Sequence, residues 1–164
     1  MEPEVHIISA HLQLVKGYFV MTNLQLKGGK EIDILAINPT TGEKLHVESR
    51  VTIEPGFRIR AKDTRTAVGR MHRRGLDTLS KEKFEHPVVK RKVQEIFGAA
   101  QYKKVLVVWE VEDTSVVEVA KEDYGIEIWR MSDLLKELKE VIGTRPYRDD
   151  VLRTIQLISK TLPQ

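Results

Sequence analysis

The 164-residue sequence predicts an α/β fold in which a mixed central β-sheet is flanked by helices. Residues 31–36 and 44–51 alternate apolar and polar side chains, as half-buried strands do. Residues 105–109 form a continuous apolar run, which is typical of a parallel strand buried on both faces. Residues 87–97 carry an apolar stripe at helical spacing, and this segment supplies the helical crossover that a parallel strand requires.

The two alternating segments are expected to form a hairpin. Pro39 presets one backbone angle and Gly42 permits a left-handed conformation, so residues 38–43 suit a tight connection. If the strands pair, Asp33 and Glu48 share one face with Cβ atoms roughly 4.5 to 5.5 Å apart. Acidic residues are depleted in strands, so this pair favours a site over two acids that only neutralise nearby Lys or Arg.

Before the hairpin, residues 3 to about 16 are predicted to form a helix and residues 18–22 a strand. Pro3 suits the first helical turn and Gly17 the end of the helix. Residues 23–30 form the next connection, which bends at Gly28-Gly29. The apolar residues at helical spacing in the first helix are Val5, Ile8, Leu12 and Val15.

The sequence signals for the remaining helices and strands vary in strength. Residues 57–83 contain few large apolar side chains, and we expect a loop ordered on binding or a short helix at 64–74. An amphipathic stretch (115–122), a strand (126–130) and a helix (about 133–142) capped by Ser132 follow. A last helix, 149 to about 161, either packs on the domain or pairs with a second copy. We predict one domain, 1–164, with a core (1–111) and a C-terminal addition (112–164).

Charge is unevenly distributed along a chain whose net charge is +3. Residues 56–92 hold twelve Lys or Arg against four Asp or Glu, whereas residues 110–150 hold six against twelve. A basic segment next to acidic strands predicts a surface that follows nucleic-acid phosphates, although such runs are also common as solvated faces. The residues predicted to bind nucleic acid are Arg58, Arg60, Lys62, Arg65, Arg70, Arg73 and Arg74.

Composition also limits the chemistry and the cellular location that we expect for the protein. The chain has no cysteine, which excludes disulfides and thiolate metal sites. No apolar run approaches the roughly 20 residues that span a bilayer, and the N-terminus lacks the basic start and apolar stretch of a secretory leader. We therefore expect a cytoplasmic protein that does not enter the membrane.

A family resemblance rests on the hairpin. The strand Glu31-Ile-Asp-Ile-Leu-Ala36, followed by Glu48-Ser49-Arg50, resembles the core of the PD-(D/E)XK nuclease superfamily. It is most similar to the archaeal Holliday junction resolvase and restriction-endonuclease-like branch. Glu4 on the first helix, and Gly17 and Val20 at the first strand, also match that pattern. The implied restriction-endonuclease-like order of elements, αβββαβ, covers most of residues 1–110. The chain departs from the pattern at Arg50, which stands at the lysine position.

The resemblance implies a divalent-metal-dependent nuclease that hydrolyses phosphodiester bonds in DNA, with branched or damaged DNA among its expected substrates. It assigns Asp33, Glu48 and the backbone carbonyl of Ser49 to Mg²⁺ or Mn²⁺, with Glu4 as a further carboxylate for which Glu2 competes. It assigns catalysis to Asp33, Glu48 and the residue at position 50. Because members of the family often act as dimers, it also implies a homodimer.

Arg50 changes what this site is expected to do. A lysine can orient or deprotonate the attacking water, but arginine keeps its proton and only steadies negative charge. Lys44, Lys62 or the basic segment are candidates to supply the missing ammonium. His46 shares the face of Glu48, where a lone histidine is more often structural than catalytic. The alternative functions are a catalytically impaired protein that binds nucleic acid or a DNA-repair partner, and an interaction subunit that uses its C-terminal helices.

Overall fold

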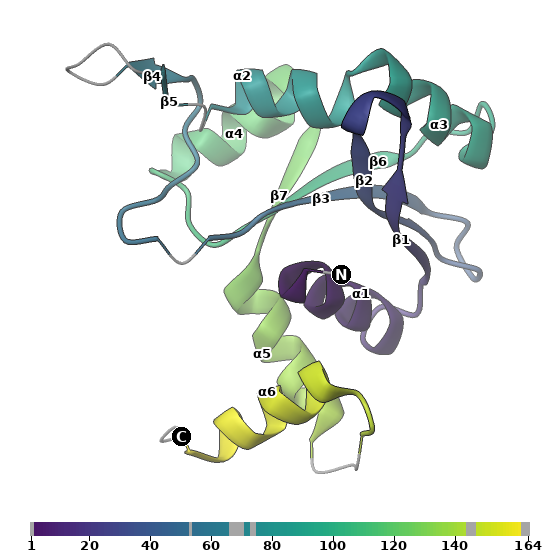
Figure 1. Ribbon diagram of the computed structural model, residues 1–164, viewed down its shortest axis with the longest axis vertical. Coiled ribbons are helices and arrows are strands. Elements are labelled where there is room, and N and C mark those ends of the chain that lie inside the picture. The colour runs from purple at the N-terminus through teal and green to yellow at the C-terminus, as the bar shows by residue number, and fades with distance from the viewer. Residues whose placement is uncertain (1, 53, 66–70, 73–74, 144–146, 162–164) are drawn as a thin grey trace.

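A five-stranded mixed sheet forms the centre of the molecule (Figure 1). The computed structural model describes residues 2–52, 54–65, 71–72, 75–143 and 147–161. The strands lie in the order β1-β2-β3-β6-β7; β1, β2 and β3 are antiparallel, whereas β6 is parallel to β3 and β7 is parallel to β6. Their bounds are Phe19–Gln25, Glu31–Ile37, Lys44–Arg50, Lys103–Val108 and Ile126–Arg130. The predicted mixed sheet is thus confirmed.

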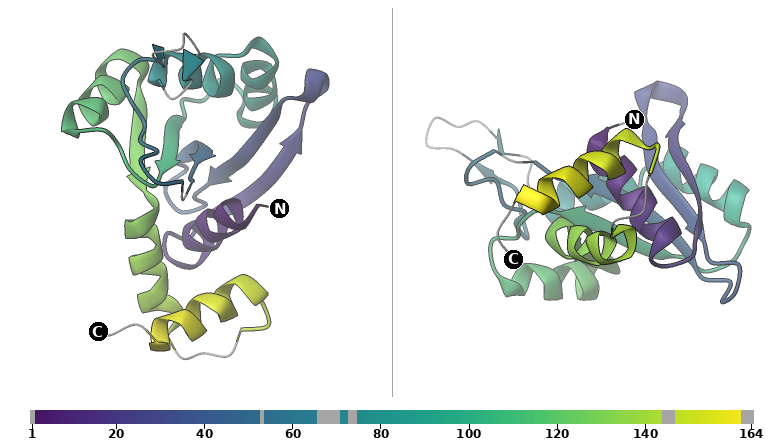
Figure 2. Two further views of the ribbon diagram at one scale, coloured as in Figure 1. Left: turned by 60° about the vertical axis from the view of Figure 1, so that its left-hand side comes forward. Right: turned by 90° about the horizontal axis from the view of Figure 1, so that it is seen from below.

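Helices cover both faces of this sheet (Figures 1 and 2). On one face lie α1 (Pro3–Leu14) and α5 (Met131–Ile142), and α6 (Asp150–Thr161) packs against both. On the other lie α2 (Leu76–Leu79), the π-helix η2 (Ser80–Phe84), α3 (Pro87–Phe97) and α4 (Thr114–Tyr124). A short 3-10 helix, η1 (Lys27–Gly29), joins β1 to β2. We call the first layer the α1/α5 layer and the second the α2/α4 layer.

The alternation of β3 explains why the two layers differ. Leu45 and Val47 are buried with α1 and α5, together with Ile34 of β2 and Val105 of β6. Because successive strand residues point to opposite faces, His46 and Glu48 face the α2/α4 layer, where Phe84 lies within ring contact of His46. One face of the hairpin is therefore apolar, and the other brings polar side chains under η2.

Of the two alternatives predicted for residues 64–74, the short helix is wrong where the structure describes them, and the loop ordered on binding stays a prediction. β4 (Thr64–Arg65) and β5 (Met71–His72) pair as a two-stranded antiparallel ribbon instead of a helix. Asp63 anchors the base of this ribbon, because its carboxylate accepts hydrogen bonds from the Gly75 N–H at 2.7 Å and from the Thr78 hydroxyl at 2.6 Å. A Cβ at Gly75 would lie 2.2 Å from the Asp63 nitrogen, so this close approach requires glycine.

Smaller differences concern the ends of elements. α5 begins at Met131, so Ser132 lies inside the helix and the predicted cap is wrong. β1 continues to Gln25, beyond the predicted end at residue 22. The predictions of a helix at 87–97, a buried strand near 105–109 and a C-terminal helix are confirmed. In the part of the chain that the structure describes, no helix is both long and apolar enough to cross a membrane.

Candidate active site

Asp33 and Glu48 lie side by side on neighbouring strands. The β2–β3 register pairs Ile34 with Val47 and Leu35 with His46, so one further step along the antiparallel ladder places Asp33 opposite Glu48. Asp33 is 6% exposed and Glu48 is fully buried. The Ser49 N–H donates a hydrogen bond of 2.7 Å to Asp33 Oδ2, which fixes that carboxylate against β3.

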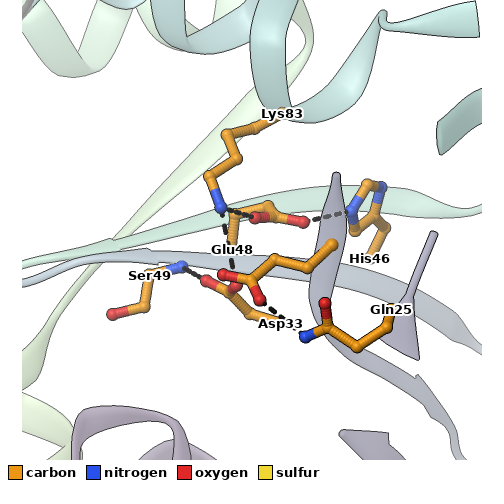
Figure 3. Close-up of polar contacts among 7 residues, drawn as sticks. Gln25, Asp33, His46, Glu48, Ser49 and Lys83 are labelled. Carbon is orange, nitrogen blue, oxygen red and sulfur yellow. Dashed lines mark hydrogen bonds and ion pairs between the residues drawn. The ribbon is translucent and has the colours of Figure 1, made fainter. Parts of the chain in front are cut away.

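A single ammonium group contacts both acids. Lys83 Nζ lies 2.9 Å from Glu48 Oε2 and 3.5 Å from Asp33 Oδ1, and its side chain reaches the strands from the helical layer above them (Figure 3). Lys83 belongs to η2, a π-helical turn. Such turns are rare, and they occur frequently at functional sites. Two carboxylates and one ammonium from three separate elements thus form one charge cluster.

The pKa values in the cluster follow from burial and from the opposed acids. Burial, and after it repulsion from Glu48, raise the pKa of Asp33 to about 6, against the lowering effects of Lys83 and of the Ser49 N–H. For Lys83, burial lowers the pKa, but the attraction of Glu48, Asp33 and Glu31 outweighs it and the pKa is raised. Lys83 is therefore held as a cation, and the two acids require a positive charge between them.

His46 holds the second oxygen of Glu48. Its Nε2 atom lies 2.8 Å from Glu48 Oε1, and both side chains are fully buried. The ring packs edge-on against Phe84 with centroids 4.8 Å apart. Among the described residues, His46 Nδ1 has no hydrogen-bond partner, which assigns the proton of a neutral ring to Nε2, where it donates to the carboxylate. The histidine therefore positions Glu48 while Lys83 neutralises it.

Replacing His46 with leucine is expected to lower the free energy of unfolding by about 2 kcal/mol, because a buried carboxylate loses a charge-assisted hydrogen bond. His46→Gln is the matched control, since its amide N–H can occupy the place of Nε2–H, and it is expected to restore most of the loss. Urea denaturation of the three proteins measures the effect. Equal stability of the leucine and glutamine variants would show that the histidine acts only by filling space.

The structure does not bring every predicted ligand to the pair. Arg50 lies at the exposed end of β3 with its guanidinium 5.7 Å from the Phe57 ring centroid, in a cation–π contact. Glu4 lies in the first turn of α1, which packs on the opposite face of the sheet. Ser49 remains beside the pair through its N–H. Of the predicted site residues, Asp33, Glu48 and Ser49 are thus brought together, whereas among the described residues neither Arg50 nor Glu4 makes a hydrogen bond or ion pair with the two acids.

The basic segment is less free than its sequence indicates. Arg58 pairs with Glu110 at 3.1 Å, and Arg60 pairs with Glu112 at 3.2 Å. Lys62 is exposed, and Arg65 is the second residue of β4. The predictions for Arg70, Arg73 and Arg74 lie outside the described residues. The arginines that precede β4 therefore meet the acidic residues that follow β6, which reduces the net positive charge there.

Sequence reasoning did not single out Lys83. The candidates for the ammonium were Lys44, Lys62 and the basic segment, which contains Lys83, but Lys44 donates to the Phe97 carbonyl at 2.9 Å and lies over the Phe97 ring. The signal that could have found η2 is the spacing of Leu76, Leu79 and Phe84, which are buried in the α2/α4 layer. Those apolar residues mark a helix whose polar positions include Lys83.

Asp33 and Glu48 provide hard oxygen ligands for a metal ion, but only two carboxylates. In the described parts of the chain, no group of three or more His, Cys, Asp or Glu side chains is placed to hold a metal ion. Mg²⁺ is commonly bound by one or two carboxylates, with waters and substrate phosphate completing its shell. Two opposed acids that already require a cation fit this ion, provided that Lys83 gives way.

Comparison with known proteins identifies the fold without a function. No family model and no curated protein matches the chain. Among solved structures, it is similar to the crystal structure of AF1548, a protein of unknown function, with a TM-score of 0.54 and 18% sequence identity over 96% of this chain and 77% of that one. The α/β architecture, with its five-stranded mixed sheet between helices, is consistent with a restriction-endonuclease-like core.

Proposed function

We propose that the protein is a divalent-metal-dependent nuclease that hydrolyses phosphodiester bonds in DNA at the Asp33–Glu48 pair. The observation that carries the proposal is the contact of one ammonium, that of Lys83, with two buried and opposed carboxylates. Lys83 thereby supplies the positive charge that Arg50 does not bring to the site. DNA as the substrate, and branched or damaged DNA within that class, rest on the family resemblance.

In this mechanism, Asp33 and Glu48 would hold Mg²⁺ or Mn²⁺. Such an ion polarises a phosphate and lowers the pKa of a bound water, which supplies the nucleophile. The Ser49 N–H and His46 keep the two carboxylates in place. Since its pKa is raised, Lys83 remains protonated and acts by stabilising negative charge on the phosphate oxygens, not as a general base.

The second candidate is a protein that binds nucleic acid or a repair partner without cleavage. It is favoured by the complete burial of Glu48, whose two oxygens already face Lys83 and His46. A metal ion has to displace the ammonium before it reaches that carboxylate. In this second function, the ion pair is a permanent structural substitute for the metal.

The two candidates are separated by incubating the purified protein with supercoiled and branched DNA in Mg²⁺, in Mn²⁺ and in EDTA. The nuclease proposal expects nicked or cleaved products with either ion and none in EDTA. The double variant Asp33→Asn/Glu48→Gln controls for contaminating nuclease. DNA binding without cleavage under every condition would support the second candidate, and equal cleavage by the double variant would reject the site.

A further inference from the structure

The carboxyl ends of the three parallel strands present a tryptophan between two arginines. The register pairs Arg50 of β3 with Val108 of β6, and Val108 with Arg130 of β7. Trp109 follows Val108 directly and is 39% exposed, although it is one of the largest apolar side chains. In open α/β sheets, ligands bind preferentially beyond the carboxyl ends of the strands. The exposed indole at this edge is therefore a candidate contact for a ligand.

Trp109 lies between two surface hollows. The larger has a volume of about 520 Å³ and is also lined by two arginines, Arg58 and Arg130, and by three acids, Glu110, Glu112 and Asp113. The smaller has a volume of about 310 Å³ and is also lined by Phe57, Glu54 and Glu110. Both volumes fall in or near the range of small-molecule sites, roughly 300 to 1,000 Å³. The indole of Trp109 thus lines both hollows, and each leaves room for a planar group beside the ring.

The charges around Trp109 leave the arginines of the flanking strands available. Glu110 pairs with Arg58, and Glu112 pairs with Arg60. Asp113 accepts hydrogen bonds from the N–H and hydroxyl groups of Ser115, and Glu54 adds a second negative charge at the smaller hollow. Within the described ranges, neither Arg50 nor Arg130 has a carboxylate at ion-pair distance. Both arginines are exposed, so positive charge borders the indole on the two neighbouring strands.

We propose that Trp109 binds an unpaired nucleotide of single-stranded nucleic acid, with the base stacked on the indole and Arg50 and Arg130 near the phosphates. Aromatic side chains beside cationic groups bind single strands in this way, because every base has a flat face. A base inside a duplex is already stacked and paired, so it cannot make this contact. The ligand class is therefore nucleic acid with unpaired bases.

This inference rests on the proposed function and narrows its substrate. Glu48 lies opposite Leu106, and Trp109 is three residues further along the chain, one residue past the end of β6. At roughly 3.3 Å per residue, this is a backbone separation of at most about 10 Å. A nucleotide stacked on Trp109 would thus lie close to the acid pair. The expected substrates are single strands, flaps and junctions with unpaired bases in preference to intact duplex.

Tryptophan fluorescence tests the site without any cleavage. Trp129, the other tryptophan, is partly buried against the α1/α5 layer, so Trp129→Phe leaves Trp109 as the sole tryptophan emitter. In EDTA, oligo(dT) is expected to quench this emission, with an affinity that falls as salt increases. A blunt duplex of equal length is expected to quench it far less. No quenching by oligo(dT), or equal quenching by the duplex, would overturn the proposal.

Variants in the otherwise unchanged protein give an independent measurement. Trp109→Ala is expected to weaken binding of labelled oligo(dT) in fluorescence anisotropy by roughly tenfold, the loss expected for one base–aromatic stack, and Trp109→Phe to retain most of the affinity. Phe19→Ala, which removes another exposed aromatic side chain, is the matched control and is expected to bind normally. Equal affinity of the Trp109→Ala variant would refute the stacking role. Because EDTA prevents metal-dependent cleavage, failure of the nuclease proposal would not affect either readout.

Discussion

Replacing Lys83 with methionine is expected to slow DNA cleavage by about 10²- to 10³-fold, the usual cost of removing a preorganised group that stabilises developing charge. Methionine has a similar length but no charge, so the helix is retained and the ammonium beside both acids is lost. Arg50→Met is expected to raise KM a few-fold with little change in kcat, because Arg50 contacts Phe57 and not the acids. Single-turnover rates at saturating DNA measure the difference.

Two further readouts make this prediction specific to Lys83. Lys81→Met removes an exposed lysine from the same π-helix and is expected to cleave at the wild-type rate. Because the Lys83 ammonium competes with a metal ion for the two carboxylates, Lys83→Met is also expected to bind Mn²⁺ more tightly, as measured by calorimetry. A larger loss of kcat in Arg50→Met than in Lys83→Met would return the role of the motif lysine to Arg50.

Asp33→Asn is expected to stabilise the metal-free protein at pH 7 and not at pH 4. Folding raises the pKa of Asp33 from 3.8 to about 6, mainly through burial. A carboxyl group of this kind favours the folded state while it is protonated, below 3.8, and the advantage is lost as the pH rises through about 6. The shift corresponds to about 3 kcal/mol. Asparagine stays neutral and still accepts the Ser49 N–H bond, so it avoids this loss.

Urea denaturation in EDTA at pH 4 and pH 7 measures the difference between the two proteins. The advantage of Asp33→Asn in unfolding free energy is expected to grow by about 2.4 kcal/mol between these values, because part of the shift is already expressed at pH 4. Asp113→Asn is a control of opposite sign, because hydrogen bonds from Ser115 lower the pKa of Asp113 and its contribution to stability is present at neutral pH. An equal effect of Asp33→Asn at both pH values would contradict the burial of an ionised acid.

The strands that carry the acids could be predicted because their signals are local. Alternation in β2 and β3, together with the turn at Gly42, places Asp33 and Glu48 on one face without any knowledge of the rest of the chain. The apolar run of β6 and the stripe of α3 are equally local. The segment before α3 is different, since Leu76, Leu79 and Phe84 are few and lie among basic residues, and their burial depends on contacts with β6 and α4.

The identity of the ammonium could not be predicted from sequence spacing. The family resemblance placed Arg50 at the site, at the motif position one alternation beyond Glu48 on the same strand. The exposed end of β3 lets that side chain turn to Phe57 instead. Lys83 reaches the acids only because the α2–η2 segment crosses the sheet above them, which is a tertiary arrangement. The ion pair between Arg58 and Glu110 could not be predicted either, because the two residues are far apart in sequence and only the tertiary fold brings them together.

Lys83 and the two acids differ in how freely their charged groups can move. The acids are fixed by the ladder of β2 and β3, which can be displaced only by breaking several backbone hydrogen bonds together. The Lys83 ammonium lies at the end of a long, partly exposed side chain, which can move by rotation about its own bonds while η2 is held in place by the buried Phe84. The Lys83 ammonium can therefore move away and return while β2 and β3 stay paired, so a metal ion can take its place without any opening of the sheet.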